Sequence, residues 1–498
     1  MSESAYLDVS AAELARKIRR KDLSIPEVVE HHIARIEEVN PLLNAVVAER
    51  FDLARQEAKL AERDLMAASD VNTLPALLGV PCTVKEFWAV QGMPQTGGLV
   101  HRKDHISQFD AELVARVRRA GAIVLGVTNV PEGGMWIECS NRLYGRTSNP
   151  WDLSRTSGGS SGGDGAIVSS GGVPFAIASD LGGSIRLPAA FCGAVGHKPT
   201  GGLVPSTNHF PGVPAEMSNY LTGGPIARRV EDLDMILQII SQESRTCSAD
   251  LREAQILDPS LLRVYVATSN GRQRVSLPVQ KGIEQCAQAF REAGAQVIEF
   301  ADPRLRRSFE IWSAMMIEVQ GASYAEVLGD GQGIELWREA LKLVVGRSEH
   351  TAPAIGIAAV DQVFRMLPKR DAFLKNLVEE GRALQRDIEN VLGDNGLLLY
   401  PPYTRTAPPH NLSFLNPLDA AYTAILNVLE FPATVVPVGQ DDDGLPIAVQ
   451  LIGKRGQDRL CLAGAAHLEA MFGGWRRVTP VATSSRDSMI ERLKAARK

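Results

Sequence analysis

The chain has 498 residues, and 53 Lys and Arg stand against 58 Asp and Glu, so the formal net charge is −5. This balance leaves no basic excess for phosphates or anionic lipids and argues against a dedicated nucleic-acid or membrane-surface binder. Apolar residues make up 45% and charged residues 22%, both near globular averages, so we expect a folded protein throughout. No apolar run approaches the roughly 18 residues that span a bilayer, and the N-terminus lacks the apolar core of a secretory signal. We therefore expect a cytoplasmic protein with no membrane span.

The N-terminal region predicts an amphipathic helical lead-in over residues 1–70, because apolar and charged positions alternate there at helical spacing. Ser24 followed by Pro26 is placed like a helix cap and a first helical turn. Residues 76–90 then predict a short, apolar, buried strand that carries one lysine, Lys85.

The rest of the chain also alternates helix and strand patterns. A helix and a strand are predicted within residues 110–131, which indicates an α/β fold with helices covering a large mixed sheet. Residues 304–390 predict an inserted helical layer, whose core-facing positions are Trp312, Met315, Met316, Trp337 and Leu341. The other elements expected after residue 228 are helices at 230–241 and 278–294, strands at 263–268, 295–300, 395–403 and 431–439, and a hairpin turning at Asp443 and Gly444. No internal repeat or Pro/Ser-rich linker interrupts this pattern, so we expect one domain over residues 1–498.

Six cysteines are scattered along the chain without CxxC spacing. This argues against a disulfide framework and against a thiolate zinc site, so we expect no bound metal. The six are predicted to be reduced residues that mostly pack in the core: Cys82, Cys139, Cys192, Cys247, Cys286 and Cys461.

Glycine is concentrated in one segment, where 13 of the 45 residues from 158 to 202 are glycine. Average usage would give about three, so the backbone must pass close to another group there. Two Gly-Gly-Ser units end at Ser160 and Ser184. A serine after two glycines can expose its hydroxyl while nearby N–H groups converge, as a nucleophile beside an oxyanion hole requires. Asp180 and Arg186 flank the second unit and are predicted to orient its backbone. The donors expected there are Leu181, Gly182, Gly183 and Ser184, ahead of a helix start.

A nucleophilic serine needs a base. The histidines considered for this role have no acidic partner that the sequence identifies: His197, His209, His410 and His467. Lys85 is the more interesting group, because an ammonium in an otherwise apolar strand loses hydration. Its pKa should fall from about 10.4 toward neutrality, which leaves an amine that accepts a proton. A solvated lysine at the end of a strand is the common alternative.

From the residues alone, three other interpretations of the glycine-rich segment stand beside this one. It could be a tightly packed turn and helix without chemistry. A phosphate cradle would need a Gly-Lys-Ser/Thr ending or GxGxxG after a strand, and neither occurs. The string GGSSG at 158–162 matches GxSxG, which would make Ser160 an α/β-hydrolase nucleophile, although the text before it is rich in turn residues rather than strand-like.

Longer motifs resemble the amidase signature family, and its fatty-acid amide hydrolase branch most. The similar segments are GVPCTVKE around Lys85, NVPEGGMWIECSNRLYG at 129–145, NPWDLSRTSGGSSGGDGA at 149–166 and SDLGGSIRLPAAFCGAVGHKPT at 179–200, and the similarity continues as far as GLPIAVQLIG. The resemblance implies a single α/β/α domain around a large twisted mixed sheet, with residues 76–230 as its signature core and the helical layer at 304–390 lining the substrate side. It also implies amide hydrolysis without a cofactor.

By motif position, the resemblance implies a Ser–cisSer–Lys triad. Lys85 would be the general base, Ser160 the bridging serine after a cis peptide bond, and Ser184 the nucleophile that carries the acyl group. The N–H groups of the second glycine unit would form the oxyanion hole. Gly134 and Met135, together with Ser160, would bind the substrate amide.

Some positions depart from the family pattern. Glu86 follows the lysine where many members carry Asp, and Ser157 precedes the first glycine pair where Pro is common. These changes are conservative enough to leave the triad assignment in place. Gly133 and Gly134 are small, and we expect them to open that side of the pocket.

The leading prediction is an amidohydrolase whose partners are a small-molecule amide and water. Its expected substrates are secondary amides with apolar acyl or aryl groups, with esters as further candidates. An amidotransferase component that supplies ammonia for tRNA-dependent amidation shares the signature and would need a partner chain. A non-catalytic binding descendant is the third hypothesis, and the intact Lys85, Ser160 and Ser184 argue against it. A homodimer is one candidate assembly.

Overall fold

An 11-stranded mixed sheet runs through the computed structural model, which describes residues 3–241, 258–319, 323–366 and 370–480. From edge to edge its strands are β1 (Val46–Glu49), β3 (Ile123–Thr128), β2 (Pro81–Lys85), β6 (Phe175–Asp180), β8 (Thr222–Ala227), β7 (Val195–Lys198), β12 (Ala433–Gln440), β13 (Pro446–Ile452), β11 (Gly396–Tyr400), β9 (Arg263–Val266) and β10 (Gln296–Glu299). A separate short hairpin pairs β4 (Ser140–Asn141) with β5 (Gly145–Arg146). One sheet thus takes strands from residues 46 to 452, and the single domain over residues 1–498 stays a prediction.

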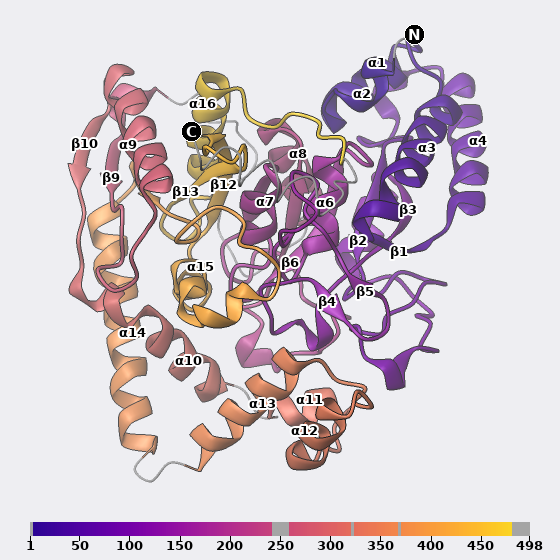
Figure 1. Cartoon of the computed structure of the whole chain (residues 1–498). Coiled ribbons are helices and arrows are strands. Elements are labelled where there is room, and N and C mark those ends of the chain that lie inside the picture. Colours follow the sequence, from indigo (N-terminus) through magenta and orange to yellow (C-terminus); the bar gives the residue numbers. More distant parts are fainter. Residues whose placement is uncertain (1–2, 242–257, 320–322, 367–369, 481–498) are drawn as a thin grey trace, which may run out of the picture.

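Helices cover the sheet and flank both of its edges (Figure 1). They are α1 (Ser4–Leu7), α2 (Ala11–Arg19), α3 (Ile25–Leu43), α4 (Phe51–Ala67), α5 (Glu112–Arg119), α6 (Gly162–Ser169), α7 (Arg186–Cys192), α8 (Val230–Ile240), α9 (Leu277–Glu292), α10 (Ser308–Val319), α11 (Tyr324–Leu328), α12 (Leu336–Val344), α13 (Ala352–Arg365), α14 (Arg370–Leu392), α15 (Ala421–Val428) and α16 (Asp458–Phe472). Helices α1 to α4 lie on the β1 side, and α9 lies on the side of β9 and β10. Helices α11, α12 and α13 gather at one end of the molecule, below the sheet in Figure 1. The predicted α/β class with a large helix-covered mixed sheet is confirmed.

The N-terminal region is helical with one exception. Ser24 caps α3, where its side chain accepts a hydrogen bond from the N–H of Glu27 (3.3 Å), and Pro26 lies in the first turn, as predicted. The prediction is wrong at β1, where the β-branched run that begins at Val46 extends and pairs with the edge of β3. The chain can turn into this strand because Asn44, which ends α3, adopts a left-handed conformation (φ 52°).

Other predicted elements are present with adjusted ends. The helix and strand within 110–131 are α5 and β3, and the C-terminal hairpin is β12 and β13. The strand predicted at 76–90 is confirmed in its middle as β2. It begins later because Gly79 turns the chain with φ +76°, and an added Cβ there would lie 2.7 Å from the side chain of Ile25.

The helical insertion predicted at 304–390 is present as α10 to α14. Met315 and Met316 are buried, and Trp312 is partly buried, as core spacing predicts. The prediction is wrong for Trp337 and Leu341, which are 62% and 61% exposed on α12. Helix α12 packs against α13 at the end of the molecule and not against the sheet, so its apolar spacing does not place these side chains in the main core.

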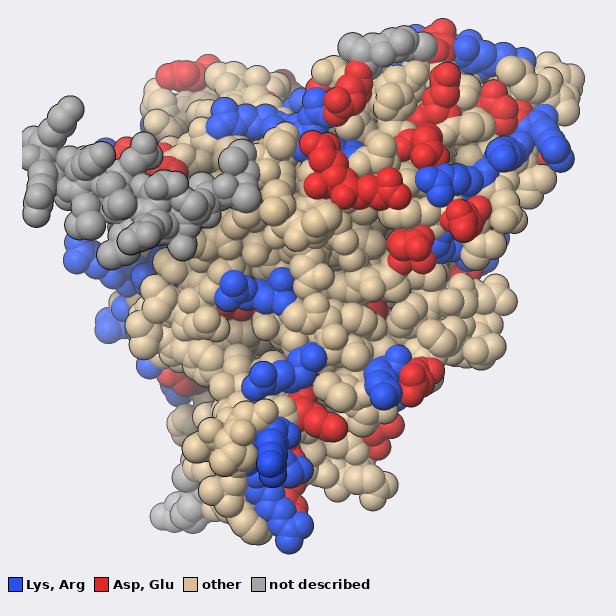
Figure 2. All heavy atoms as spheres, turned by 45° about the vertical axis from the view of Figure 1, so that its right-hand side comes forward, with Lys and Arg blue, Asp and Glu red and all other residues tan. Residues whose placement is uncertain are grey.

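The state of the cysteines and the distribution of surface charge agree with what the sequence predicts. Five cysteines are free and buried, and Cys247 lies outside the described residues. On the face in Figure 2, basic and acidic side chains lie interspersed, most densely over the N-terminal helices. Within the ranges that the structure describes, no helix is both long and apolar enough to cross a bilayer.

The sheet brings two strand ends together. Strand β2 is parallel to β6, with Val84 paired with Ile177. Because parallel neighbours end at the same edge of a sheet, Lys85 at the end of β2 lies beside the end of β6. The loop that contains Ser184 begins at this edge and leads into α7.

Candidate active site

Lys85 is fully buried and contacts two serines at this sheet edge. Its Nζ lies 2.8 Å from Ser160 Oγ, 3.0 Å from Ser179 Oγ and 3.2 Å from the carbonyl oxygen of Ser179. Every polar neighbour of the amine among these contacts is uncharged. The predicted contact between Lys85 and Ser160 is therefore present, and Ser179 is an additional partner.

The first glycine unit presents Ser160 to the lysine from the loop before α6. The peptide bond between Gly159 and Ser160 is cis, and Ser160 is 3% exposed. Added side-chain bulk has no room at Gly159, where a Cβ would lie 2.5 Å from the carbonyl oxygen of Trp136. The close approach that the glycine density predicted is thus a backbone contact with the segment before β4.

The second glycine unit places Ser184 between β6 and α7. Ser184 is partly exposed, and its carbonyl oxygen accepts a hydrogen bond from the N–H of Ser161 (3.2 Å), which joins the two glycine units. Ser160 and Ser184 both line a cavity of about 380 Å³. The structure therefore brings Lys85, Ser160 and Ser184 to one region.

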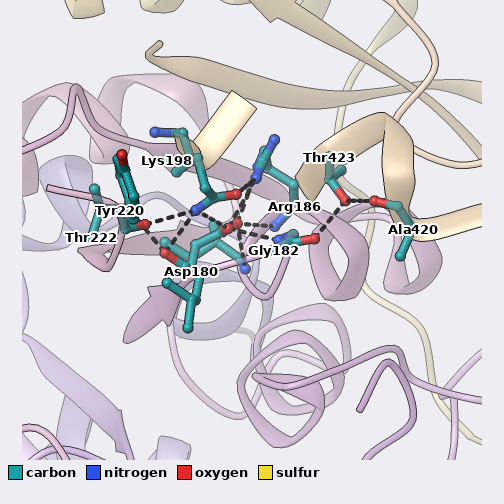
Figure 3. A network of polar contacts seen from close by, with 12 residues as sticks. Asp180, Gly182, Arg186, Lys198, Tyr220, Thr222, Ala420 and Thr423 are labelled. Carbon is teal, nitrogen blue, oxygen red and sulfur yellow. Dashed lines mark hydrogen bonds and ion pairs between the residues drawn. The ribbon is translucent and has the colours of Figure 1, made fainter. Parts of the chain in front are cut away.

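The loop that leads to Ser184 is held through its carbonyl groups. Each of four successive carbonyl oxygens accepts a hydrogen bond from outside the loop or from the following helix, and Figure 3 shows the one at Gly182. The acceptors and donors are Asp180 with Asn427 Nδ2 (3.0 Å), Leu181 with Trp312 Nε1 (3.3 Å), Gly182 with Thr423 Oγ1 (2.9 Å) and Gly183 with Leu187 N (2.7 Å). In a trans peptide unit the C=O and the next N–H point in opposite directions, so these bonds also set the directions of the N–H groups.

One of the four predicted oxyanion donors is engaged within the protein. The N–H of Gly183 donates to Asp180 Oδ1 (2.7 Å). The backbone N–H groups of Leu181, Gly182 and Ser184 are the remaining candidates. Gly183 itself has φ +125°, and a Cβ there would lie 2.2 Å from Thr423 Oγ1, so only glycine fits.

Asp180 and Arg186 form a fully buried ion pair that orients this loop (Figure 3). Arg186 donates from Nη2 to Oδ1 (2.9 Å) and from Nε to Oδ2 (3.1 Å), and the N–H of Ile185 donates to Oδ2 (3.0 Å). Burial by itself opposes ionisation, but Arg186 and these N–H groups lower the pKa of Asp180 well below its ordinary value. The predicted orienting role of Asp180 and Arg186 agrees with these contacts.

The surroundings of Lys85 favour the neutral amine. Burial lowers the pKa of Lys85 well below its ordinary value of 10.5, although the nearby carboxyl groups of Asp164 and Asp180 act in the opposite direction. Burial likewise raises the pKa of Asp164, whose Oδ1 accepts a hydrogen bond from Thr128 Oγ1 (2.6 Å). Asp164 lies just after the first glycine unit, and the sequence alone predicted no role for it.

His209 also lies in the site, although no sequence motif assigned it a place there. His209 Nε2 lies 2.9 Å from Ser179 Oγ, so it contacts the lysine's second serine. Ser179 was not predicted to belong to the site, and His209 was considered only as a base for which the sequence identifies no acidic partner. His197 has an acidic partner after all, Asp458 Oδ1 at 3.1 Å, but it also contacts Thr434 and lies outside the cavity lining.

Two cavities meet at Ser184. The larger one, about 380 Å³, contains Ser160, Ser179 and His209 in its lining, and the smaller one, about 190 Å³, extends from Ser184 toward Trp312. No Asp, Glu, Lys or Arg is found among the described residues that line either cavity. A neutral, mostly apolar substrate fits such a lining.

Gly134 and Met135, predicted to bind the substrate amide, line both cavities. We expected Gly133 and Gly134 to open this side of the pocket because they are small, and this expectation is wrong. A Cβ at Gly134 would lie 2.8 Å from the ring of Phe87, and one at Gly133 would lie 3.1 Å from Tyr324 Oη. The space beside them is already filled by aromatic side chains.

Comparisons with known proteins show that the chain is similar to amidases in sequence and in fold. The sequence profile of the amidase family matches residues 27–462. Fatty-acid amide hydrolase 2-A of Danio rerio is 40% identical over 94% of this chain and 89% of its own length. An acylamidase of Rhodococcus erythropolis is 31% identical over 95% of this chain and 97% of its own length. The solved structure of a bacterial aryl acylamidase of the amidase signature enzymes has a TM-score of 0.77 and 28% identity, covering 94% of this chain and 97% of that one.

Replacing Asp180 by Asn should lower the free energy of unfolding by about 3–5 kcal/mol at pH 7, because Arg186 would stay buried without its counter-charge. Denaturant unfolding of both proteins measures this difference. Since the folded-state pKa of Asp180 is lowered, its stabilisation is present above the ordinary value of 3.8 and is lost as the pH falls below it. The exposed pair of Arg55 with Glu30 (2.9 Å) is the matched control, and Glu30→Gln should cost less than about 1 kcal/mol. Equal costs for the two substitutions would contradict a structural role for the buried pair.

Proposed function

Because the chain belongs to the amidase family, we propose that it hydrolyses neutral carboxylic amides with apolar acyl or aryl groups through an acyl-enzyme on Ser184. The protein is an amidase, an enzyme that cleaves amide bonds. The observation that carries the finer proposal is the buried hydrogen bond between Lys85 and Ser160 beside Ser184, at the meeting point of two uncharged cavities.

In the proposed acylation step, protons move along the line from Ser184 to Lys85. Neutral Lys85 accepts the hydroxyl proton of Ser160, and Ser160 accepts that of Ser184 as Ser184 Oγ forms a bond to the substrate carbonyl carbon. The N–H groups of Leu181, Gly182 and Ser184 stabilise the oxyanion, and each such donor typically contributes about 3 kcal/mol. A base without charge suits this site, because the reaction then starts with no uncompensated buried charge on the lysine.

The return of the proton completes the cycle. The amide nitrogen receives a proton from Ser160, which regains one from the Lys85 ammonium, and the C–N bond breaks as the amine leaves. Water then attacks the acyl-enzyme with the same groups acting in the opposite sense, and it releases the acid. Esters should react as well, because an alkoxide leaves with less need for protonation by Ser160.

The uncharged lining supports a neutral substrate and separates the leading hypothesis from the amidotransferase. Free glutamine carries an ammonium and a carboxylate, and the described lining offers neither a carboxylate nor a basic side chain to pair with them. His209 is the lining residue that could otherwise supply a positive charge. Burial lowers the pKa of His209 to about 3, so its ring is neutral. The contact between Lys85 and Ser160 also argues against a non-catalytic binding protein. Cytoplasmic location and a homodimer stay predictions.

A panel of anilides tests the substrate class. A fatty acyl anilide should be hydrolysed, whereas the same anilide with a terminal carboxylate on the acyl chain should show kcat/KM lower by roughly 100-fold or more, because the cavity would bury an unpaired charge. The control is the methyl ester of that terminal carboxylate, which matches its size without the charge. The released aniline is measured by its absorbance. Equal rates for the charged and neutral substrates, or turnover of glutamine alone, would count against the proposal.

Ser184→Ala should reduce turnover by roughly 10⁴- to 10⁶-fold, because the alanine cannot form the acyl-enzyme. A fluorophosphonate should add to the peptide that contains Ser184 in the wild type and to no peptide in the variant, as read by mass spectrometry. Ser170→Ala is the matched control, because the hydroxyl of Ser170, at the end of α6, donates to the nearby carbonyl of Ile167 (3.1 Å). Labelling at Ser160 instead would favour the GxSxG interpretation of the first glycine unit.

The acid side of the pH profile should report Lys85. The base must be neutral, so kcat/KM should fall as the pH drops through the lowered pKa of Lys85 and reach its plateau well below pH 10.5. Lys85→Ala should lower kcat/KM by roughly 10²- to 10⁴-fold at the plateau. Lys85→Arg keeps a cation that does not lose its proton and should be inactive throughout. Either variant with the rate of the wild type at neutral pH would show that Lys85 is not the base.

A further inference from the structure

We propose that His209 is a positioning residue for the base: acting through the Ser179 hydroxyl, it turns the lone pair of neutral Lys85 toward Ser160. This inference rests on the proposed function, because it concerns how the amine is presented to the serine that it deprotonates. It is carried by a continuous line of contacts that runs from Pro211 through His209 and Ser179 to Lys85.

The first link sets the tautomer of the imidazole. His209 Nδ1 lies 2.9 Å from the carbonyl oxygen of Pro211, and a carbonyl only accepts, so Nδ1 carries the hydrogen. Burial lowers the pKa of His209 to about 3, and the ring is therefore neutral near pH 7. A neutral imidazole has one N–H, so Nε2 is left with a lone pair and can only accept.

The second link sets the direction of the serine hydroxyl. Nε2 of His209 lies 2.9 Å from Ser179 Oγ, and because this nitrogen only accepts, the Ser179 hydroxyl donates to it. The only proton of the Ser179 hydroxyl is then used in the hydrogen bond to His209. Toward Lys85, 3.0 Å away, Ser179 Oγ presents only lone pairs and must accept a hydrogen bond from Nζ.

The third link orients the amine. A neutral lysine has two N–H bonds and one lone pair on Nζ. The two N–H bonds are taken by Ser179, one by its Oγ at 3.0 Å and one by its carbonyl oxygen at 3.2 Å. The remaining direction, the lone pair, faces Ser160 Oγ at 2.8 Å, which is the arrangement a base needs to receive the Ser160 proton.

The imidazole is held where this line requires it. Its ring makes edge-to-face contacts with the rings of Phe87 and Trp88, at centroid distances of 5.4 and 4.6 Å. The backbone of His209 also forms an isolated bridge with Trp88, three residues after Lys85. Without the acceptor at Nε2, the Ser179 hydroxyl would be free to rotate and donate to the lysine lone pair, in competition with Ser160.

The experiment compares rates at which a fluorophosphonate labels Ser184, because this readout does not depend on the leaving amine. His209→Leu removes the acceptor and should slow labelling by about 10- to 100-fold. His209→Gln keeps an acceptor oxygen within reach of Ser179 and should stay within about threefold of the wild type. Ser179→Ala should be as slow as His209→Leu, and the double variant should be no slower than the slower single one, since both changes break one line of contacts.

Controls separate this inference from a loss of fold and from the proposed function. His32→Leu removes another buried histidine, on α3, which bonds to the carbonyl of Val28 (2.8 Å), and it should leave the labelling rate unchanged. The inference is overturned if His209→Leu is labelled at the rate of the wild type, if His209→Gln is as slow as His209→Leu, or if the double variant is slower by the product of the single effects. A wild-type protein that is not labelled, or a Lys85→Ala variant labelled as fast as it, would instead overturn the proposed function.

Discussion

The buried carboxylate of Asp180 is the constraint on which the geometry of the site depends. A carboxylate cut off from water must take its hydrogen bonds from the protein, and Asp180 takes them from the guanidinium of Arg186 and from the N–H groups of Gly183 and Ile185. To supply these donors, the chain after β6 curls around the carboxylate. That curl presents Ser184 at the cavity surface and leaves only glycine acceptable at 183. The conformation of the segment from Asp180 to Arg186 is thus set by hydrogen bonds and an ion pair to one buried carboxylate.

Exclusion of water is the common physical cause behind both the proposed base and the proposed substrate preference. The apolar surroundings that disfavour an ammonium on Lys85 continue into the two cavities at Ser184, whose described lining holds no Asp, Glu, Lys or Arg. A charged substrate would have to lose its hydration there without a partner, at a cost that a neutral amide does not meet. A charged residue introduced to recognise a polar substrate would also change the ionisation of the lysine. The chemistry and the specificity therefore share one physical origin.

Parts of the fold and of the site could be predicted from the sequence where a motif or a periodic pattern encodes them. The helix-covered mixed sheet was predictable, because apolar periodicity encodes it. The contact of Lys85 with Ser160 joins segments that are far apart in the sequence, and it was predicted only through the family resemblance, which connects the two motif positions. The contact of Ser179 with His209 had no such guide, since it forms only when separate segments fold against each other. For the same reason Trp337 was misjudged. Helical spacing identifies an apolar face, but whether another element covers that face is decided by the tertiary fold.

The last two residues of β6, Ser179 and Asp180, belong to two neighbouring polar networks with different electrostatic character. Side chains of consecutive strand residues point to opposite faces. Asp180 therefore turns to Arg186 on one face, which lowers the pKa of its carboxyl, while Ser179 turns to Lys85 and His209 on the other, where burial lowers the pKa of both groups. The networks share the backbone, because Lys85 also donates to the carbonyl of Ser179. A displacement of this strand end would move Lys85 and the loop that carries Ser184 together, so the relative position of these two residues depends on the central sheet.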